Sequence, residues 1–145
     1  MDFNNQFVKQ LIDFAIAEDI GDGDHSSLGA IPAGTQGHAR LLVKDEGILC
    51  GVPLARHIME RIDADVIFDQ LIEEGAEVTF GDIAFTVKGS VHSILQAERL
   101  MLNFMQRMSG VATVTQNLVK LIEGTNAKLL DTRKTTPGLR TFEKY

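Results

Sequence analysis

The chain begins with a helical pattern of apolar positions. In QFVKQLIDFAIAEDI, residues 6–20, the apolar residues at helical spacing include Phe7, Leu11, Phe14 and Ala15. Such spacing places side chains on one face of an amphipathic helix, and glycine is a common residue just after a helix. The pattern therefore predicts a first helix that ends near Gly21.

The middle of the chain has the shorter apolar runs that are typical of β-strands. HARLLVKDEGILCG places two such runs on either side of residues 44–47, which predicts a hairpin, and a helix is expected from Val52 to about Ile62. ADVIFDQ is a further short predicted strand. Two more β-type runs, residues 77–80 and 83–88, are separated by Gly81-Asp82, which predicts a tight turn between them.

From His92 to about Glu123 the pattern becomes helical again. One stripe is apolar and is expected to face the core; it consists of Ile94, Ala97, Met101, Met105, Met108 and Ala112. The opposite stripe consists of Gln96, Arg99, Asn103 and Arg107. A polar stripe usually faces solvent, but Asn103 between two apolar neighbours suggests that this one faces a polar cleft. Ser109-Gly110 predicts a kink or a break into a second helix.

Composition narrows the class of protein and its partners. The 145 residues are 44% hydrophobic, which is enough for one domain with a buried core. A net charge of −6 argues against a general nucleic-acid surface, because phosphate backbones are held by excess cations. No segment approaches the ~18 apolar residues of a membrane span, and the N-terminus lacks the features of a signal peptide. With a single cysteine, Cys50, we expect a cytoplasmic protein without membrane or nucleic-acid partners.

Positive charge nevertheless gathers near the C-terminus. Residues 128–145 carry the five cations Lys128, Arg133, Lys134, Arg140 and Lys144 against two acids, Asp131 and Glu143. DTRKTTPGLR follows the apolar run AKLLD, which predicts a strand, and RTFEKY predicts the first turns of a helix. In parallel α/β folds ligand contacts gather where strands end, which favours Arg133 and Lys134 as anion-binding residues. A solvated charge run is the alternative interpretation.

The loop GDGDHSS, residues 21–27, holds a second group of candidate residues. Asp22, Asp24 and His25 are residue types that bind metal ions. Asp, Gly and Ser are also the residues that turns and helix caps use. We therefore expect a structural loop rather than a metal site.

Three motifs carry a resemblance to a known family. They are AEDIGDGDHSS (17–27), AERLMLNFMQRMSGVAT (97–113) and LLDTRKTTPGLRTFEKY (129–145). The last is the most specific. The order and separation of the three motifs also match, and together with the compatible hairpins between them the resemblance covers essentially the whole chain. In these motifs the chain resembles quinolinate phosphoribosyltransferase, also called nicotinate-nucleotide pyrophosphorylase (carboxylating).

The resemblance implies a reaction and its partners. Members of this family join the pyridine nitrogen of quinolinate to phosphoribosyl pyrophosphate, release pyrophosphate and carbon dioxide, and form nicotinate mononucleotide for NAD biosynthesis. Quinolinate and phosphoribosyl pyrophosphate would be the small-molecule partners, with Mg²⁺ bridging the pyrophosphate oxygens. Both substrates carry several negative charges, which suits guanidinium and ammonium groups.

The resemblance also implies roles for four residues. Arg133 resembles the arginine that holds a quinolinate carboxylate, Lys134 resembles the lysine beside the phosphoribosyl group, and Thr132 belongs to the same binding tripeptide. Arg99 resembles an arginine that reaches the dicarboxylate from a neighbouring subunit, so a homodimer or a larger homo-oligomer is expected. No catalytic residue and no metal ligand is expected among the 145 residues.

The implied fold is α+β. A hammerhead-like N-terminal α/β sandwich with connecting helices, residues 1–110, would precede the start of an α/β-barrel phosphoribosyltransferase domain, residues 111–145. AKLLD would be the first strand of that barrel. Because such a barrel needs ~250 residues in its usual form, we expect the chain to be a fragment or a truncated form that is inactive alone.

Other classes of function remain open. EEGAEVTFGDIAFTVKG resembles the hairpins of swinging-arm carriers, although its tip, residues 80–82, lacks the lysine that such carriers modify. A paralogue on the same scaffold, either molybdenum-transport-associated or specific for nicotinate, is a second alternative. The complete DTRKTTPGLR favours quinolinate, although the molybdenum-transport-associated relative keeps a similar motif. A non-catalytic dimerisation or binding module is the remaining alternative.

Overall fold

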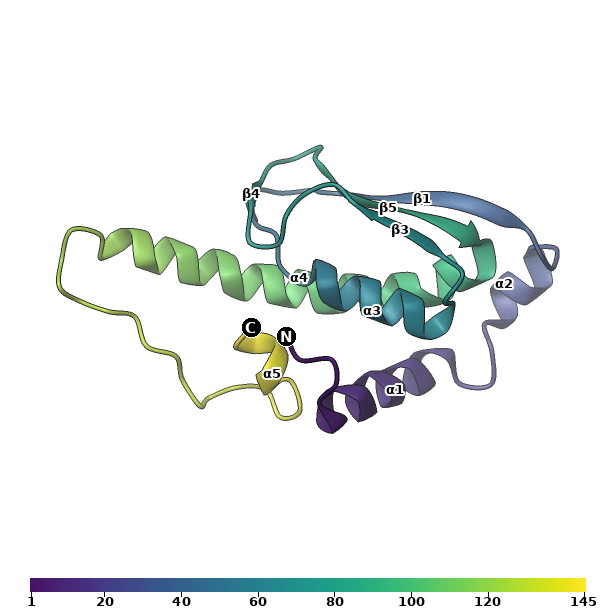
Figure 1. Ribbon diagram of the computed structural model, residues 1–145, viewed down its shortest axis with the longest axis horizontal. Coiled ribbons are helices and arrows are strands. Elements are labelled where there is room, and N and C mark those ends of the chain that lie inside the picture. Colours follow the sequence, from purple (N-terminus) through teal and green to yellow (C-terminus); the bar gives the residue numbers. More distant parts are fainter.

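Three antiparallel strands form the uppermost layer in Figure 1, which shows the computed structural model of residues 1–145. They are β1 (Gln36–Leu42), β5 (Ile83–Ser90) and β3 (Ile67–Gln70), in the order β1-β5-β3. Below the sheet lie α3 (Val52–Ile62) and the long α4 (Val91–Leu121), and α1 (Gln6–Ile20) lies beneath these helices. The described fold is α+β, as the sequence predicts.

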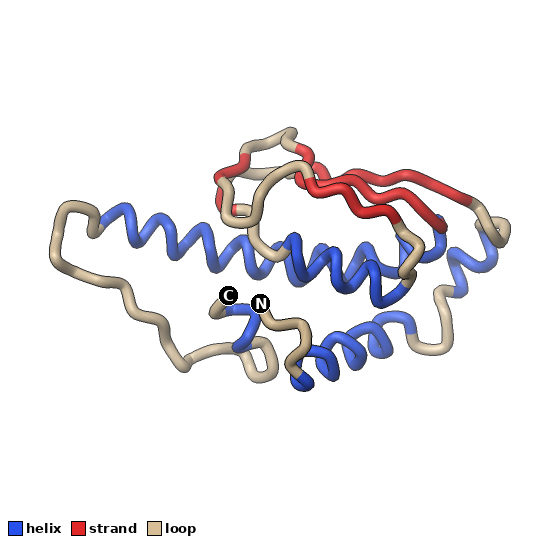
Figure 2. The backbone as a smooth tube through the Cα atoms, in the orientation of Figure 1, coloured by secondary structure: helices blue, strands red, loops and turns tan.

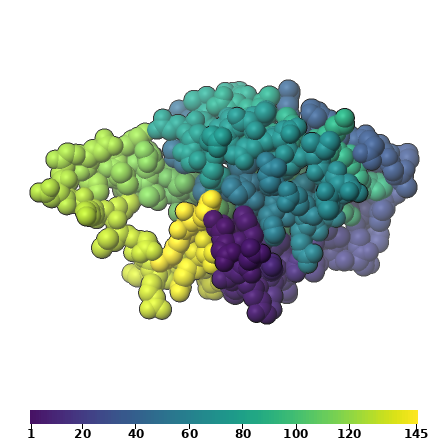
Figure 3. All heavy atoms as spheres, in the orientation of Figure 1, coloured from purple at the N-terminus to yellow at the C-terminus, as the bar shows by residue number.

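The remaining elements are short. α2 (His25–Ala30) connects α1 to β1, and α5 (Arg140–Glu143) follows a long irregular segment, residues 122–139, which Figure 2 draws as loop. β2 (Gly47–Ile48) and β4 (Glu77–Val78) form a separate two-stranded sheet. None of the helices combines the length and the apolar character that crossing a membrane requires. The two ends of the chain lie side by side, with α5 against the N-terminal residues (Figures 1 and 3).

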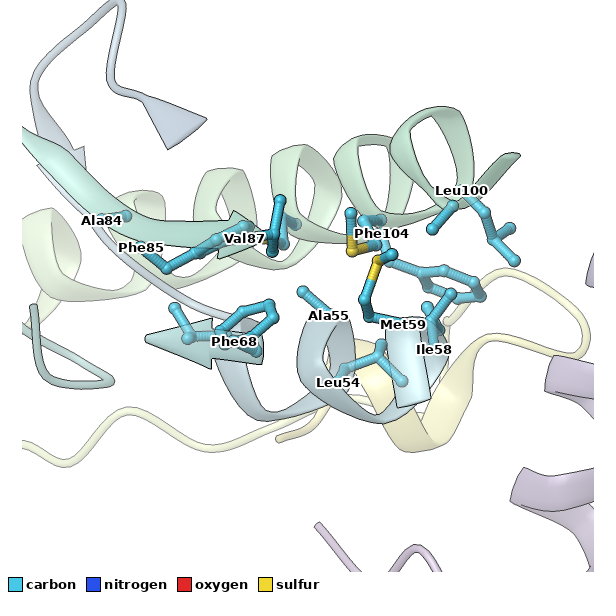
Figure 4. Packing of buried hydrophobic residues seen from close by; sticks show 14 of the residues in the cluster. Leu54, Ala55, Ile58, Met59, Phe68, Ala84, Phe85, Val87, Leu100 and Phe104 are labelled. Carbon is cyan, nitrogen blue, oxygen red and sulfur yellow. The ribbon is translucent and has the colours of Figure 1, made fainter. Parts of the chain in front are cut away.

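The core lies between the sheet and the two helices beneath it. Figure 4 shows Ile58 of α3 beside Phe104 of α4, with Phe68 and Phe85 at the sheet. The rings of Phe68 and Phe85 stack with centroids 4.4 Å apart. Burying a large apolar side chain contributes about 1.5–3 kcal/mol relative to leaving it exposed. This one cluster extends from α1 to α5 and includes Phe142, so the C-terminal helix belongs to the same core.

Strand pairing differs from the hairpin expected over residues 38–51. β1 pairs with β5, while β2 pairs with β4, so the two apolar runs of that segment belong to different sheets. The chain turns away after Val43, whose N–H donates to the carbonyl of Asp82 at 2.8 Å. The expected turn between β4 and β5 is present, with Asp82 N–H donating to the Thr79 carbonyl at 3.2 Å. The sequence identified the extended segments but not their partners, because partner choice depends on distant residues.

The first helix is confirmed, but only part of its expected apolar stripe faces the core: Leu11 and Ala15 pack against the core, and Phe7 and Phe14 do not. Val8 and Ile12 are the buried residues of α1, whereas Phe7 is 50% exposed and Phe14 is 68% exposed. One residue advances a helix by about 100°, so a shift from Phe7 to Val8 rotates the buried stripe. Several apolar positions lie on this helix, and only its contact with the core selects among them.

The expected kink at Ser109-Gly110 is wrong. α4 runs without interruption from Val91 to Leu121. The Ser109 hydroxyl accepts a hydrogen bond from Cys50 N–H at 2.9 Å and donates to the Cys50 carbonyl at 3.1 Å. One turn later, Thr113 accepts a hydrogen bond from Ile48 N–H at 2.9 Å. These small polar residues therefore attach the 48–50 segment to the helix rather than break it.

The close approach of the 47–50 segment to α4 explains why residue 47 is a glycine. A side chain at Gly47 would lie 2.5 Å from the Thr113 hydroxyl, and no such contact occurs in real proteins. The glycine lets the backbone of β2 lie directly against α4.

The strand expected at AKLLD, residues 127–131, is not formed. These residues are irregular and exposed. A strand needs a neighbour with which to exchange backbone hydrogen bonds, and no other segment of this chain pairs with them. Arg133 and Lys134 therefore do not follow the end of a strand in this structure, contrary to the prediction from the sequence.

Candidate functional site

The loop with the motif DTRKTTPGLR is attached to the core at its C-terminal end, where α5 begins. α5 docks through Phe142, which is 3% exposed and lies 4.8 Å from the ring of Phe104 on α4. A turn precedes α5, closed by a hydrogen bond from Leu139 N–H to the Thr136 carbonyl at 3.0 Å, and Gly138 adopts φ 83° within it. This positive φ favours glycine, which the sequence provides after Pro137.

The predicted binding residues of this loop are exposed and available. Thr132, Arg133 and Lys134 are all exposed, and the Thr132 hydroxyl accepts a hydrogen bond from Lys134 N–H at 3.1 Å. None of the five ion pairs of the chain includes Arg133 or Lys134. Both side chains are therefore free to contact an anionic ligand.

Arg140 supports the loop instead of extending its charged surface. Its guanidinium donates to the Thr135 hydroxyl at 3.1 Å and to the Arg133 carbonyl at 3.3 Å. Lys144 forms an ion pair with Asp131. Of the five cations near the C-terminus, these two are therefore used within the tail.

Thr132 and Lys134 line a large cleft of about 1040 Å³ between the tail and the C-terminal half of α4. Apolar side chains of α4, including Val111 and Leu118, form much of its wall. Cys50 lies in the same cleft, and burial, followed by the charge of Glu74, raises the pKa of its thiol to about 12. A neutral, half-buried thiol is a poor nucleophile, so Cys50 is not a candidate for covalent chemistry.

Arg99 lies in a different and smaller cleft of about 450 Å³, between α2 and the N-terminal half of α4. Asp24, Ser27 and Asn103 also line it. Arg99 is exposed and takes part in none of the ion pairs. The expectation that the polar stripe faces a polar cleft is met at Arg99 and Asn103.

The structure thus brings two of the four predicted site residues together and separates the others. Thr132 and Lys134 share one cleft, Arg99 lines another, and Arg133 lines neither of these two. Within one chain, Arg99 and the loop do not form a single pocket.

Arg107 differs from the other members of its stripe. Sequence analysis placed it beside Arg99 and Asn103 as a residue of a polar face. In the structure its guanidinium is bonded to the carboxylate of Glu143 and to the hydroxyl of Thr136. Glu143 was not recognised from the sequence, and no local signal identifies it, because its partner lies 36 residues away.

The loop GDGDHSS is structural, as expected. Asp24 caps α2: its carboxylate accepts hydrogen bonds from the Ser27 hydroxyl and from Ser27 N–H, the latter at 3.1 Å. These bonds lower the pKa of Asp24. His25 lies 3.1 Å from Asp22. No group of three His, Cys, Asp or Glu side chains in the chain is placed to hold a metal ion.

Comparison with known proteins gives two consecutive family matches. The model described as quinolinate phosphoribosyl transferase, N-terminal domain, matches residues 23–109, and the corresponding C-terminal domain matches residues 111–145. A probable nicotinate-nucleotide pyrophosphorylase [carboxylating] of Synechocystis is 41% identical over 130 residues, which are 90% of this chain and 44% of that protein. The chloroplastic enzyme of Arabidopsis thaliana is 40% identical over 139 residues, which are 95% of this chain and 39% of that protein.

Solved structures agree with these matches. NadC from Streptococcus pyogenes superposes with a TM-score of 0.94 at 33% identity and covers 100% of this chain and 52% of its own. The nicotinate-nucleotide pyrophosphorylase from Francisella tularensis gives a TM-score of 0.90 at 40% identity, covering 97% of this chain and 50% of its own. This chain therefore spans about half the length of the relatives it matches.

Fold and sequence together place the chain in the class of phosphoribosyl transferases that join an α+β N-terminal domain to a separate C-terminal domain. Within that class the chain belongs to the quinolinate phosphoribosyl transferase family, whose N-terminal model matches more than half of it. The resemblance stated from the three motifs is confirmed.

Proposed function

We propose that residues 1–145 supply the N-terminal half of an enzyme that transfers a phosphoribosyl group to quinolinate with decarboxylation, giving nicotinate mononucleotide. The observation that carries this proposal is the exposed loop in which Arg133 and Lys134 are free of intramolecular ion pairs. It is supported by relatives named as nicotinate-nucleotide pyrophosphorylases. The division into domains at residue 110 is part of the proposal, and it falls within the continuous helix α4.

The loop residues suit the charges of the two substrates. A planar guanidinium such as that of Arg133 can donate two parallel hydrogen bonds to a carboxylate of quinolinate. Lys134 presents a compact ammonium suited to phosphate oxygens. Fixed cations near the reacting groups oppose the negative charge that develops on the departing pyrophosphate. The contribution of these residues is to bind and orient, and no proton transfer is assigned to them.

Mg²⁺ is proposed to arrive with phosphoribosyl pyrophosphate rather than on a site within residues 1–145. The donor set of this chain does not fit a resident ion, because no three His, Cys, Asp or Glu side chains converge. The pyrophosphate oxygens are themselves ligands for Mg²⁺. We also propose a cytoplasmic location, supported by the single cysteine, Cys50, with its free thiol.

Arg99 is proposed to complete the pocket of a second copy of the chain in a homodimer. Support comes from its exposed, unpaired guanidinium and from its position in a cleft that excludes Thr132, Arg133 and Lys134. A two-fold interface would bring the Arg99 cleft of each protomer to the loop of its partner. Quinolinate, as a dicarboxylate, offers one carboxylate to each of two arginines.

The test compares substrates and one variant in the product of the complete reading frame. With Mg²⁺ and phosphoribosyl pyrophosphate, we expect turnover of quinolinate but not of nicotinate. Arg133→Ala should weaken quinolinate binding by at least about tenfold, because a charge-assisted pair contributes roughly 1.5–3 kcal/mol. Arg40→Ala, on the exposed face of β1, is the matched control.

Three outcomes would count against the proposal. Turnover of nicotinate alone would favour a paralogous enzyme, and unchanged quinolinate binding by Arg133→Ala would exclude this residue from the site. Residues 1–145 alone should be inactive; measurable synthesis of nicotinate mononucleotide by them would show that the reaction does not need a second domain.

A further inference from the structure

Three side chains from three parts of the chain meet beside the anion-binding loop. Arg107 of α4 donates from Nε to Oε1 of Glu143 at 2.7 Å, and a terminal nitrogen of its guanidinium contacts the same carboxylate and the Thr136 hydroxyl. The other carboxylate oxygen of Glu143 accepts a hydrogen bond from Thr136 N–H at 3.0 Å. Thr136 is therefore held through both its side chain and its backbone. We call Arg107, Thr136 and Glu143 the loop clamp.

The loop clamp is anchored to the core. Glu143 follows Phe142, whose ring is buried against Phe104, and the Glu143 side chain is only 9% exposed. Hydrogen bonds from Arg107 and from Thr136 hold the pKa of Glu143 below its usual range. The carboxylate is thus ionised at neutral pH and remains an acceptor for both partners.

Thr136 connects the loop clamp to the two cations, Arg133 and Lys134, because it lies close to them in the chain. Thr136 lies two residues after Lys134 and three after Arg133, and its carbonyl closes the turn that leads into α5. The Arg133 carbonyl is held separately by Arg140. These contacts fix the backbone on the C-terminal side of the two cations and leave both of their side chains free.

A purely stabilising role explains this arrangement less well. An ion pair with one partner open to water contributes little to stability, and Arg107 is 47% exposed. The chain offers a comparison in Arg61, which is 56% exposed and donates two hydrogen bonds to Asp13 at 2.8 and 3.1 Å. That pair joins α3 to α1 and touches no residue of the loop. Both pairs join an arginine to a carboxylate, but the side chain of Glu143 is 9% exposed and that of Asp13 is 46% exposed, and the two pairs hold different parts of the chain.

We propose that Arg107 and Glu143 are positioning residues that keep the Arg133-Lys134 loop in its anion-binding shape, an inference that rests on the proposed function. Neither residue is proposed to bind substrate directly, although Glu143 lines the same cleft as Thr132 and Lys134. They act through Thr136, so their loss should weaken ground-state binding of quinolinate more than it slows turnover.

The first test measures the loop itself in residues 1–145. Backbone hydrogen exchange at Thr136 should become at least about tenfold faster in Arg107→Met and in Glu143→Gln, because each change removes a bond that protects or positions this amide. Arg61→Met, the matched control, should leave it unchanged. Exchange at Thr136 that is equally slow in all variants would overturn the clamp.

The second test measures function in the product of the complete reading frame. Arg107→Met and Glu143→Gln should raise KM for quinolinate by about tenfold with a kcat change of less than about threefold, and Arg107→Lys should recover part of the loss. Arg61→Met should change neither constant. Melting temperatures should fall in both Arg107→Met and Arg61→Met, and further in Arg107→Met, because this change leaves the nearly buried Glu143 carboxylate without its guanidinium.

Different results of these two tests would contradict the loop clamp and the proposed function. An active wild type whose KM does not respond to Glu143→Gln contradicts the clamp alone. An equal rise of KM in Arg61→Met would show a general loss of stability and would also overturn it. Absence of quinolinate turnover in the wild type contradicts the proposed function, whereas exchange at Thr136 still decides whether the clamp holds the loop.

Discussion

Phe142 packs its ring against that of Phe104, with centroids 4.8 Å apart and planes tilted by 50°. Phe104 lies in the middle of α4, and Phe142 is the buried residue of the four-residue helix α5. A helix of one turn has little stability of its own. This aromatic pair therefore attaches the C-terminal tail, which includes the proposed anion-binding loop of residues 131–140, to the core of the fold.

Removing that ring should release the tail without unfolding the sheet. If α5 stayed docked on α4, Phe142→Ala would lower the stability of the docked form by about 3–5 kcal/mol. A helix of one turn cannot offset this loss, so residues 122–145 should undock. Trypsin should then cleave at Lys128, Arg133 and Lys134 at least about tenfold faster. Phe80→Ala is the control, since Phe80 is 72% exposed; equal cleavage rates in all three proteins would show that Phe142 does not hold the tail.

Glu74 caps α3 from a distant loop, and its loss should destabilise the fold. The two carboxylate oxygens accept hydrogen bonds from Gly51 N–H at 2.7 Å and Val52 N–H at 2.9 Å, and the helix has no side-chain cap of its own. Glu74→Ala should lower the free energy of unfolding by about 0.5–2 kcal/mol, the usual range for a lost cap. Urea denaturation measures this change. Glu73→Ala, an exposed neighbour whose side chain forms no hydrogen bond, should have almost no effect, and a similar loss from both would rule out capping.

The thiol of Cys50 should alkylate slowly and show an unusual dependence on pH. Burial raises its pKa to about 12, so the neutral thiol is favoured in the folded state. The stabilisation is complete below the unfolded pKa of ~8.5 and is lost as pH rises from there toward 12. The rate of reaction with iodoacetamide should rise about tenfold per pH unit up to pH ~10 in the folded protein and level off above pH ~9 in urea. A plateau near pH 9 in the folded protein would contradict the raised pKa.

Mixed dimers test whether Arg99 serves a neighbouring protomer. In the product of the complete reading frame, Arg99→Ala and Arg133→Ala should each abolish most quinolinate turnover. Co-folded subunits of the two variants should regain activity, because one of the two pockets in each mixed dimer then receives both wild-type arginines. Enzyme assays on purified mixed dimers measure this recovery. A pocket built within one chain predicts no recovery, and that result would return Arg99 to the class of surface cations.

Local signals sufficed for several elements of the fold. Apolar periodicity predicted α1, α3 and α4, because a helix of that length shows its pattern within a few turns. The Asp, Gly and Ser residues of GDGDHSS indicated a structural loop, and Asp24 caps α2 because its short polar side chain reaches Ser27 N–H within the same turn. The motif containing Arg133 and Lys134 indicated the family, and the family models agree.

Contacts between distant residues were decided only by the tertiary structure. Whether α1 buries Val8 or Phe7 depends on the rotation at which the helix meets the core, and Ser109 could not be distinguished from a helix breaker until Cys50 was placed beside it. Arg99 and Arg107 are two turns apart on one polar stripe and look alike in sequence. The sequence by itself determined that the loop is cationic; the fold decided that Arg107 is neutralised by Glu143, 36 residues away, while Arg99 stays free, because pairing of charges depends on distance in space and not along the chain.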